Sequence, residues 1–155
     1  MRKKELFTDE DAGDLKEVEC IIDALDQAQP IPAGCSIHSV GEALLSFLNT
    51  LAEPVVPFAM YQRFVNTDSY GEYKQLLLSL KTAHYNVFYY LVAFLRDSVL
   101  RISSESPPTS ERVDQVASVF AEVILRAPHV EQQDNYKRAV QFIRSFLASP
   151  VLRIP

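Results

Sequence analysis

The chain has 155 residues, of which 48% are hydrophobic and 23% charged, and its formal net charge is −5. These values are typical of a single globular domain that is long enough to bury a core. The negative charge argues against a nucleic-acid binder that neutralises phosphates, and no apolar run reaches the ~20 residues that span a bilayer.

Two cysteines, Cys20 and Cys35, have neither the spacing of a metal site nor that of a disulfide framework. We therefore expect reduced thiols in a cytoplasmic protein, with no metal and no cofactor. The basic residues 1–4 are not followed by an apolar stretch, so they do not form a signal peptide.

Helical periodicity predicts three helices in the first part of the chain. Residues 14–28 form an amphipathic helix whose apolar stripe faces a core, and the stripe consists of Leu15, Val18, Ile21, Ile22 and Leu25. Ser39 followed by Glu42 has the pattern of a capping box, which begins a second helix that ends before Pro54. A third helix is expected from Pro57 to about Val65.

Four more helices are predicted downstream, at 70–80, from Thr82 or His84 to about 102, from 109 or 110 to 126, and from a cap at Asp134 to 149. The segment 82–102 is apolar nearly all round and belongs at the centre of a bundle, with Arg96 at its polar end. Residues 103–109 have the composition of an internal loop. No strand-like alternation is present, so the fold class is an all-α bundle of about six or seven helices, forming one domain over 1–155 with a core at about 6–149.

Conventional catalytic motifs are absent from the sequence, which has no phosphate loop, metal-spaced cluster or nucleophile elbow. The three histidines, His38, His84 and His129, lie far apart, and we expect hydrogen bonds at helix ends for the first two. The acidic run at 9–11 is expected to be a solvated N-terminal turn.

Several sequence segments resemble segments of the Rho GTPase-activating (Rho GAP) domain and follow one another in the same order. The second predicted helix, which begins at Ser39, resembles the signature helix of that domain. It runs into Leu51-Ala52-Glu53-Pro54, followed by Phe58 and Tyr61. Residues 38–45 and 86–96 are most similar to the Rho GAP-like domain that ends the inositol polyphosphate 5-phosphatases of the oculocerebrorenal (Lowe) syndrome type. The resemblance covers about 6–147 and implies an N-terminally truncated helical bundle, because the family usually has one or two helices upstream of these residues.

In this family an arginine enters the GTPase and stabilises the transition state, an effect of about 10³–10⁵ in rate. The resemblance places Thr8, in Glu5-Leu6-Phe7-Thr8, at that arginine. It places Leu45 and Asn49 at a lysine and an arginine of the signature helix, and Val123 at a later asparagine. The resemblance therefore implies that the domain is not an enzyme and has no catalytic residue of its own.

The implied function is a catalytically inactive interaction module in signalling or endosomal trafficking, within a larger inositol 5-phosphatase. Candidate GTPase-facing residues are Thr8, Glu42, Asn49, Glu53 and Arg126. For Arg126 two readings stay open, a partner contact or a response to the dipole of the helix before it.

The expected partners are Rac/Cdc42-like GTPases and adaptor peptides with a Phe-and-His motif. The expected location is the cytoplasm, with recruitment to endosomal or plasma membranes through partners. Two alternatives are an active GAP, which would need an arginine from elsewhere such as Arg2, and a helical domain that only holds a phosphatase in position.

Overall fold

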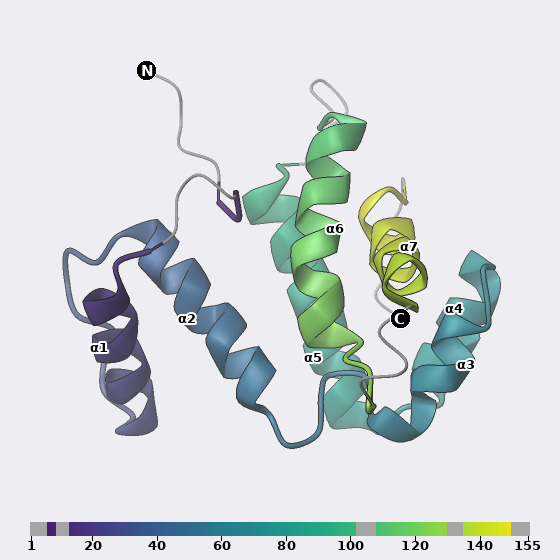
Figure 1. Cartoon of the computed structure of the whole chain (residues 1–155), viewed down its shortest axis with the longest axis horizontal. Coiled ribbons are helices and arrows are strands. Elements are labelled where there is room, and N and C mark those ends of the chain that lie inside the picture. The colour runs from purple at the N-terminus through teal and green to yellow at the C-terminus, as the bar shows by residue number, and fades with distance from the viewer. Residues whose placement is uncertain (1–5, 9–12, 102–107, 130–134, 150–155) are drawn as a thin grey trace. The chain divides into compact units, whose positions relative to one another are not determined.

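The computed structural model describes residues 6–8, 13–101, 108–129 and 135–149 (Figure 1). All regular elements within these ranges are helices, which confirms the all-α fold class and the expected number of helices. The chain divides into two compact units, Met1–Leu51 and Ala52–Pro155. Within the described ranges, no helix is long and apolar enough to cross a bilayer.

The first unit pairs α1 (Leu15–Asp26) with α2 (Ile37–Thr50). Asp14 caps α1, because its Oδ1 accepts hydrogen bonds from the backbone N–H groups of Lys16 and Glu17 at 2.9 and 3.2 Å. The start of α1 thus agrees with the prediction to within one residue.

The predicted capping box at the start of α2 is wrong. Ser36 is the N-cap, and its Oγ accepts from the backbone N–H of His38 at 3.2 Å. Ser39 lies inside the first turn, fully buried, and its hydroxyl bonds to the first helix and the segment before it. Glu42 is exposed and takes no part in the cap.

The predicted stripe of α1 is only partly buried. Ile21 has no exposed surface, whereas Leu15 and Leu25 are 72% and 48% exposed. A single partner helix in the same unit covers only one side of α1, so the ends of the stripe are not covered by α2.

The second unit holds the remaining elements. They are the 3₁₀ turn η1 (Phe58–Met60), α3 (Tyr61–Val65), α4 (Tyr70–Leu78), α5 (Thr82–Phe94), the π-helical turn η2 (Leu95–Val99), α6 (Ser110–Ile124) and α7 (Tyr136–Leu147). The helix predicted at 57–65 is therefore split into η1 and α3. Figure 1 shows α6 and α7 packed side by side. The predicted cap at Asp134 and the loop residues 103–107 lie outside the described residues.

Aromatic rings from four helices form the core of the second unit. Five of them have no exposed surface: Phe64, Tyr73, Phe88, Phe142 and Phe146. Phe88 stacks on Phe142 with ring centroids 5.4 Å apart, and Tyr73 meets Phe142 edge-on at 5.0 Å. Each such pair adds about 0.5–1.5 kcal/mol beyond its buried area, so this cluster joins α3, α4 and α5 to α7.

The expectation that α5 is buried all round is wrong in part. Phe88 and Val92 are fully buried, but Val87 is 44% and Tyr90 is 81% exposed. The face of α5 that carries Val87 and Tyr90 is therefore apolar but lies at the surface of the second unit and not at its centre.

Arg96 is the largest departure from the sequence-based expectation. It was expected at a polar end, but it is 7% exposed and lies in the π-helical turn η2. Its Nη1 donates to the carbonyl oxygens of Phe146, Leu147 and Ser149 at 2.8, 3.2 and 2.6 Å. The guanidinium therefore satisfies backbone acceptors at the C-terminal end of α7.

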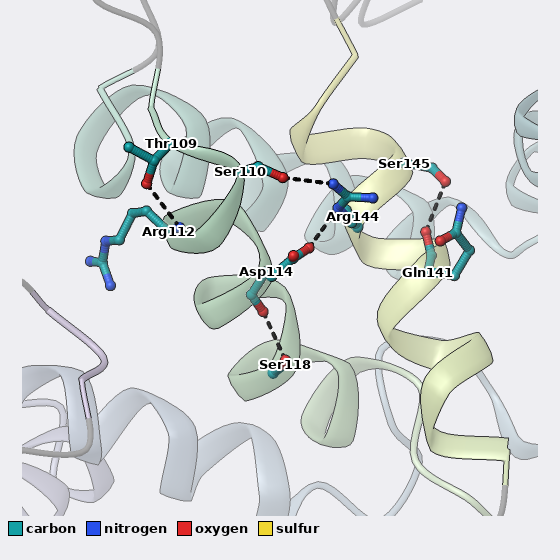
Figure 2. Close-up of polar contacts among 8 residues, drawn as sticks. All are labelled: Thr109, Ser110, Arg112, Asp114, Ser118, Gln141, Arg144 and Ser145. Carbon is teal, nitrogen blue, oxygen red and sulfur yellow. Dashed lines mark hydrogen bonds and ion pairs between the residues drawn. The ribbon is translucent and has the colours of Figure 1, made fainter.

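Polar contacts at the surface also join α6 to α7 (Figure 2). Arg144 Nε lies 2.5 Å from Asp114 Oδ1, and Arg144 Nη2 donates to Ser110 Oγ at 3.0 Å. Thr109, one of the two predicted caps, caps α6 by accepting from the backbone N–H of Arg112 at 3.2 Å.

Candidate functional site: a helix face, the segment beside it and a turn

One face of α2 carries two of the positions that the resemblance singles out. Gly41, Leu45 and Asn49 are spaced four residues apart, so they follow one side of the helix over about 12 Å. Gly41 is buried, Leu45 half-buried and Asn49 exposed. The half-buried position thus holds an aliphatic side chain, and the exposed one holds a neutral amide.

Thr8 follows a residue that packs on the same helix. A Cβ atom at position 41 would lie 3.1 Å from Cε1 and 3.4 Å from Cζ of Phe7, so the phenyl ring lies against the backbone of α2 at Gly41. The φ of Phe7 is 60°, in the left-handed region that residues other than glycine rarely adopt. Thr8 is half-buried next to this contact.

Gly13 and Asp14 also contact α2. A Cβ atom on Gly13 would lie 2.6 Å from Cα of Ser39, which only glycine allows. The backbone N–H of Asp14 donates to Ser39 Oγ at 3.1 Å, and Ser39 Oγ donates to Glu17 Oε1 at 2.9 Å.

The Glu17 carboxylate links three segments of the first unit. Its Oε1 also accepts from the backbone N–H of Ser36, at 3.1 Å. Burial and, to a smaller degree, this carboxylate and Cys20 raise the pKa of the Cys35 thiol. Sequence reasoning missed this network, because its members come from different elements. The Gly-Asp pair before α1 was its one local signal.

Within the second unit, hydrogen bonds hold a turn at residues 53–58. Glu53 Oε1 accepts from the backbone N–H of Phe58, the first residue of η1, at 2.7 Å. The backbone N–H of Val56 donates to the carbonyl oxygen of Ile124, and His84 Nδ1 donates to that of Val55, at 3.1 and 2.9 Å. The turn is therefore held by the C-terminal end of α6 and the N-terminal end of α5.

Arg126 lies just after α6 and packs on this turn. Its Cζ is 5.4 Å from the centroid of the Phe58 ring, within range of a cation–π contact. Val123 is 7% exposed within α6, as expected for helix packing. Glu53 and Arg126 thus both contact Phe58, the first at its backbone N–H and the second at its ring, while Val123 has a buried position with no polar atom in its side chain.

The histidines differ from one another. His84 makes the predicted hydrogen bond at a helix end. The prediction for His38 is wrong, since neither of its buried ring nitrogens has a hydrogen-bond partner in the part of the chain that the structure describes. The reason is that α2 starts at Ile37, which leaves His38 in its first turn, facing inward. Among residues 6–8, 13–101, 108–129 and 135–149, no group of three potential ligands could hold a metal ion.

Thr8, Glu42, Leu45 and Asn49 therefore belong to the first unit, and Glu53, Val123 and Arg126 to the second. The described part of the chain is all-helical, and α2 is followed by the Glu53-Pro54 turn. These are features of a GTPase-activating domain of the Rho GAP type. The sequence profile of the RhoGAP domain matches residues 6–129, and the chain belongs to that family.

The chain is also similar in sequence to individual proteins. Type II inositol 1,4,5-trisphosphate 5-phosphatase from Mus musculus is 34% identical over an alignment of 155 positions. The alignment covers 97% of this chain and 15% of the relative. Rho GTPase-activating protein 22 from Mus musculus is 32% identical over 104 residues, covering 61% of this chain and 14% of its own length. Rho GTPase-activating protein 24 from Homo sapiens is 29% identical over 130 aligned positions, which cover 77% of this chain and 17% of the relative.

A solved structure has the same fold. The BH domain from GRAF, the GTPase regulator associated with focal adhesion kinase, has a TM-score of 0.70 and 18% identity, and the match covers 88% of this chain and 76% of that one. The chain spans only 14–17% of the length of the curated relatives described above.

Proposed function

We propose that this RhoGAP domain binds Rho-family GTPases as an interaction module and does not accelerate GTP hydrolysis. The observation that carries the proposal is the chemistry at four positions. Thr8, Leu45, Asn49 and Val123 stand where the resemblance expects an arginine, a lysine, a second arginine and an asparagine. None of the four carries a positive charge.

The surroundings of these residues support the loss of catalysis. Phosphoryl transfer is accelerated by donors and cations that are placed in advance around the developing charge. Threonine is short and neutral, and the side chains of Leu45 and Val123 have no donor at all. Val123 is also packed in the helical core, 7% exposed, so its substitution belongs to a buried layer of α6.

Binding depends on a different set of contacts. Glu42, Asn49 and Glu53 are exposed polar residues, and the Arg126 guanidinium lies over the Phe58 ring. Exposed side chains on rigid elements are suited to partner contact, because little of their surroundings must be ordered on binding. The domain is thus proposed as a pseudo-GAP in which each unit keeps residues for partner contact.

The test combines binding with single-turnover hydrolysis. GTP-loaded Rac/Cdc42-like GTPases are passed over the immobilised domain, and their hydrolysis is then followed with the domain in excess. We expect capture of a GTPase and a hydrolysis rate within about twofold of the intrinsic rate, against the 10³–10⁵ of an inserted arginine. Strong acceleration by the unmodified domain would refute the proposal and support the active-GAP alternative.

Variants sharpen the hydrolysis measurement. Thr8→Arg alone is expected to give little acceleration, because the bracing positions on α2 and α6 also lack their polar groups. Adding Leu45→Lys, Asn49→Arg and Val123→Asn tests whether those positions are the missing part. Strong activity of Thr8→Arg by itself would show that the bracing residues are not needed.

We further propose, from the similarity to an inositol 5-phosphatase over nearly the whole chain, that the module serves such an enzyme in signalling or endosomal trafficking. Phe-and-His motif adaptor peptides are the second class of partner in this proposal. Peptide capture in the same assay tests it. Failure to capture either GTPases or peptides would favour a domain that only holds its neighbour in position.

A further inference from the structure

The segment that carries residue 8 is attached to α2 on both sides of residues 9–12. Before them the Phe7 ring lies on Gly41, and after them Gly13 contacts the backbone of Ser39. The hydrogen bond from Asp14 N–H to Ser39 Oγ fixes the second attachment. Both attachments lie within the first unit, so their geometry does not depend on how the two units are arranged.

The backbone of Phe7 supplies an independent observation. Its φ of 60° is costly for a residue with a bulky side chain, and such conformations persist only where the surroundings enforce them. Here the surroundings include the buried backbone of α2 at Gly41, where the absence of a side chain leaves room for the ring. Unusual backbone angles of this kind concentrate at binding and switch segments.

The position of the contact relates it to the candidate site. Gly41 is the first member of the helix face that continues through Leu45 and Asn49. The contact therefore places Phe7, the residue before Thr8, at the start of the same face that holds two other positions singled out by the family resemblance.

We propose that Phe7 and Gly41 are positioning residues, which hold the segment at Thr8 against α2 as a preformed part of the GTPase-docking surface. The inference rests on the proposed function, because it assumes a GTPase partner. It adds that the segment still contributes to binding although it carries threonine. It also assigns Gly41 a role in making room for a ring rather than in bending the helix.

Gly41→Ala is the central variant, and Gly71→Ala is its matched control. A methyl group at position 41 meets the Phe7 ring at 3.1 Å, so the ring has to shift, whereas a methyl group at position 71 meets only Ser69 Oγ at an ordinary 3.7 Å. Both changes replace a helical glycine with a better helix former, so their effects on helix propensity are alike. Phe7→Ala removes the same contact without altering α2.

The first readout is amide hydrogen exchange of the peptide containing residues 6–14, which does not require a partner. We expect Gly41→Ala and Phe7→Ala to speed exchange in this peptide by about tenfold or more, while Gly71→Ala leaves it unchanged. The second readout is the dissociation constant for the GTPase captured by the unmodified domain. We expect it to rise by about fivefold or more in the two contact variants and not in the control.

The double variant separates positioning from two unrelated losses. Because Phe7 and Gly41 make one contact, Gly41→Ala combined with Phe7→Ala should weaken binding no more than the larger single change. Additive losses, or unchanged affinity in Gly41→Ala while the unmodified domain binds, would overturn the inference and leave the proposed function intact. If the unmodified domain captures no GTPase, the proposed function fails, and the binding half of this inference fails with it. Unchanged exchange in Phe7→Ala would overturn the positioning half whatever the binding result.

Discussion

Replacing Arg96 should destabilise the second unit more than any surface arginine does. The side chain is 7% exposed, and its Nη1 reaches the carbonyl oxygens of Phe146, Leu147 and Ser149. The first two are among the last four carbonyls of α7, which have no partner within the helix. Arg96→Met keeps most of the aliphatic stem and removes only the charged donor.

The expected magnitude follows from this geometry. Nη1 has two hydrogens, so three acceptors share about two full hydrogen bonds, each worth about 1.5–3 kcal/mol when the donor is charged. The positive charge at the C-terminal end of α7 adds up to about 2 kcal/mol. Against these gains stands a desolvation cost of several kcal/mol, which methionine does not incur. We therefore expect Arg96→Met to lower the free energy of unfolding by about 2–4 kcal/mol.

Tyrosine fluorescence makes the measurement specific to one unit. The chain has no tryptophan, and all seven tyrosines lie between positions 61 and 136, within Ala52–Pro155. Urea unfolding followed by this signal thus reports the unit that contains Arg96. Arg63→Met, at an exposed position of α3, is the control and should change the free energy by less than about 0.5 kcal/mol.

A specific result would refute this reasoning. If Arg96→Met unfolds at the same urea concentration as the control, the three carbonyl oxygens are equally well satisfied by water, and the buried guanidinium contributes nothing net. A change in the slope of the urea dependence would instead indicate that the substitution alters the denatured or native ensemble.

Three smaller predictions concern other contacts. Asp114→Ala should cost less than about 1 kcal/mol by urea unfolding, and less at high salt, because its pair with Arg144 is half exposed; a loss above 2 kcal/mol would contradict this. Gly34→Ala should destabilise by about 1 kcal/mol in thermal unfolding although no atom lies near its Cβ, since its φ is 84°; a neutral result would refute the conformational argument. Alkylation of Cys35 by iodoacetamide, measured by mass spectrometry, should reach half its maximal rate at a higher pH than an ordinary thiol requires. Glu17→Gln should move that midpoint down, and an unmoved midpoint would exclude a contribution from the carboxylate.

Helix positions could largely be predicted from the sequence, because periodicity and caps are local. The sequence predicts helix starts at Asp14 and at Thr109 or Ser110, and in the structure Asp14 and Thr109 are the N-caps of α1 and α6. The start of α2 could not be predicted, since Ser36 and Ser39 are equally good caps. The choice depends on the hydrogen bond between Ser39 and Glu17, which belongs to another helix.

The burial of Arg96 could not be predicted for a related reason. A charged residue at the end of an apolar helix is expected to reach solvent, because burying a charge is costly. The carbonyl oxygens that offset this cost come from α7, about fifty residues later in the chain. No pattern within the predicted helix at 82–102 contains that information.

The candidate site illustrates the same limit on a single residue. In the sequence, Gly41 indicates only a weaker helix, by about 1 kcal/mol relative to alanine. In the structure, the same glycine makes room for the Phe7 ring, and by our proposal this contact positions Thr8. These two effects have opposite signs in Gly41→Ala, because the helix gains propensity while the segment beside it loses its support. A variant that keeps or raises the melting temperature while residues 6–8 exchange faster would therefore show that this glycine is present for the contact and not for the helix.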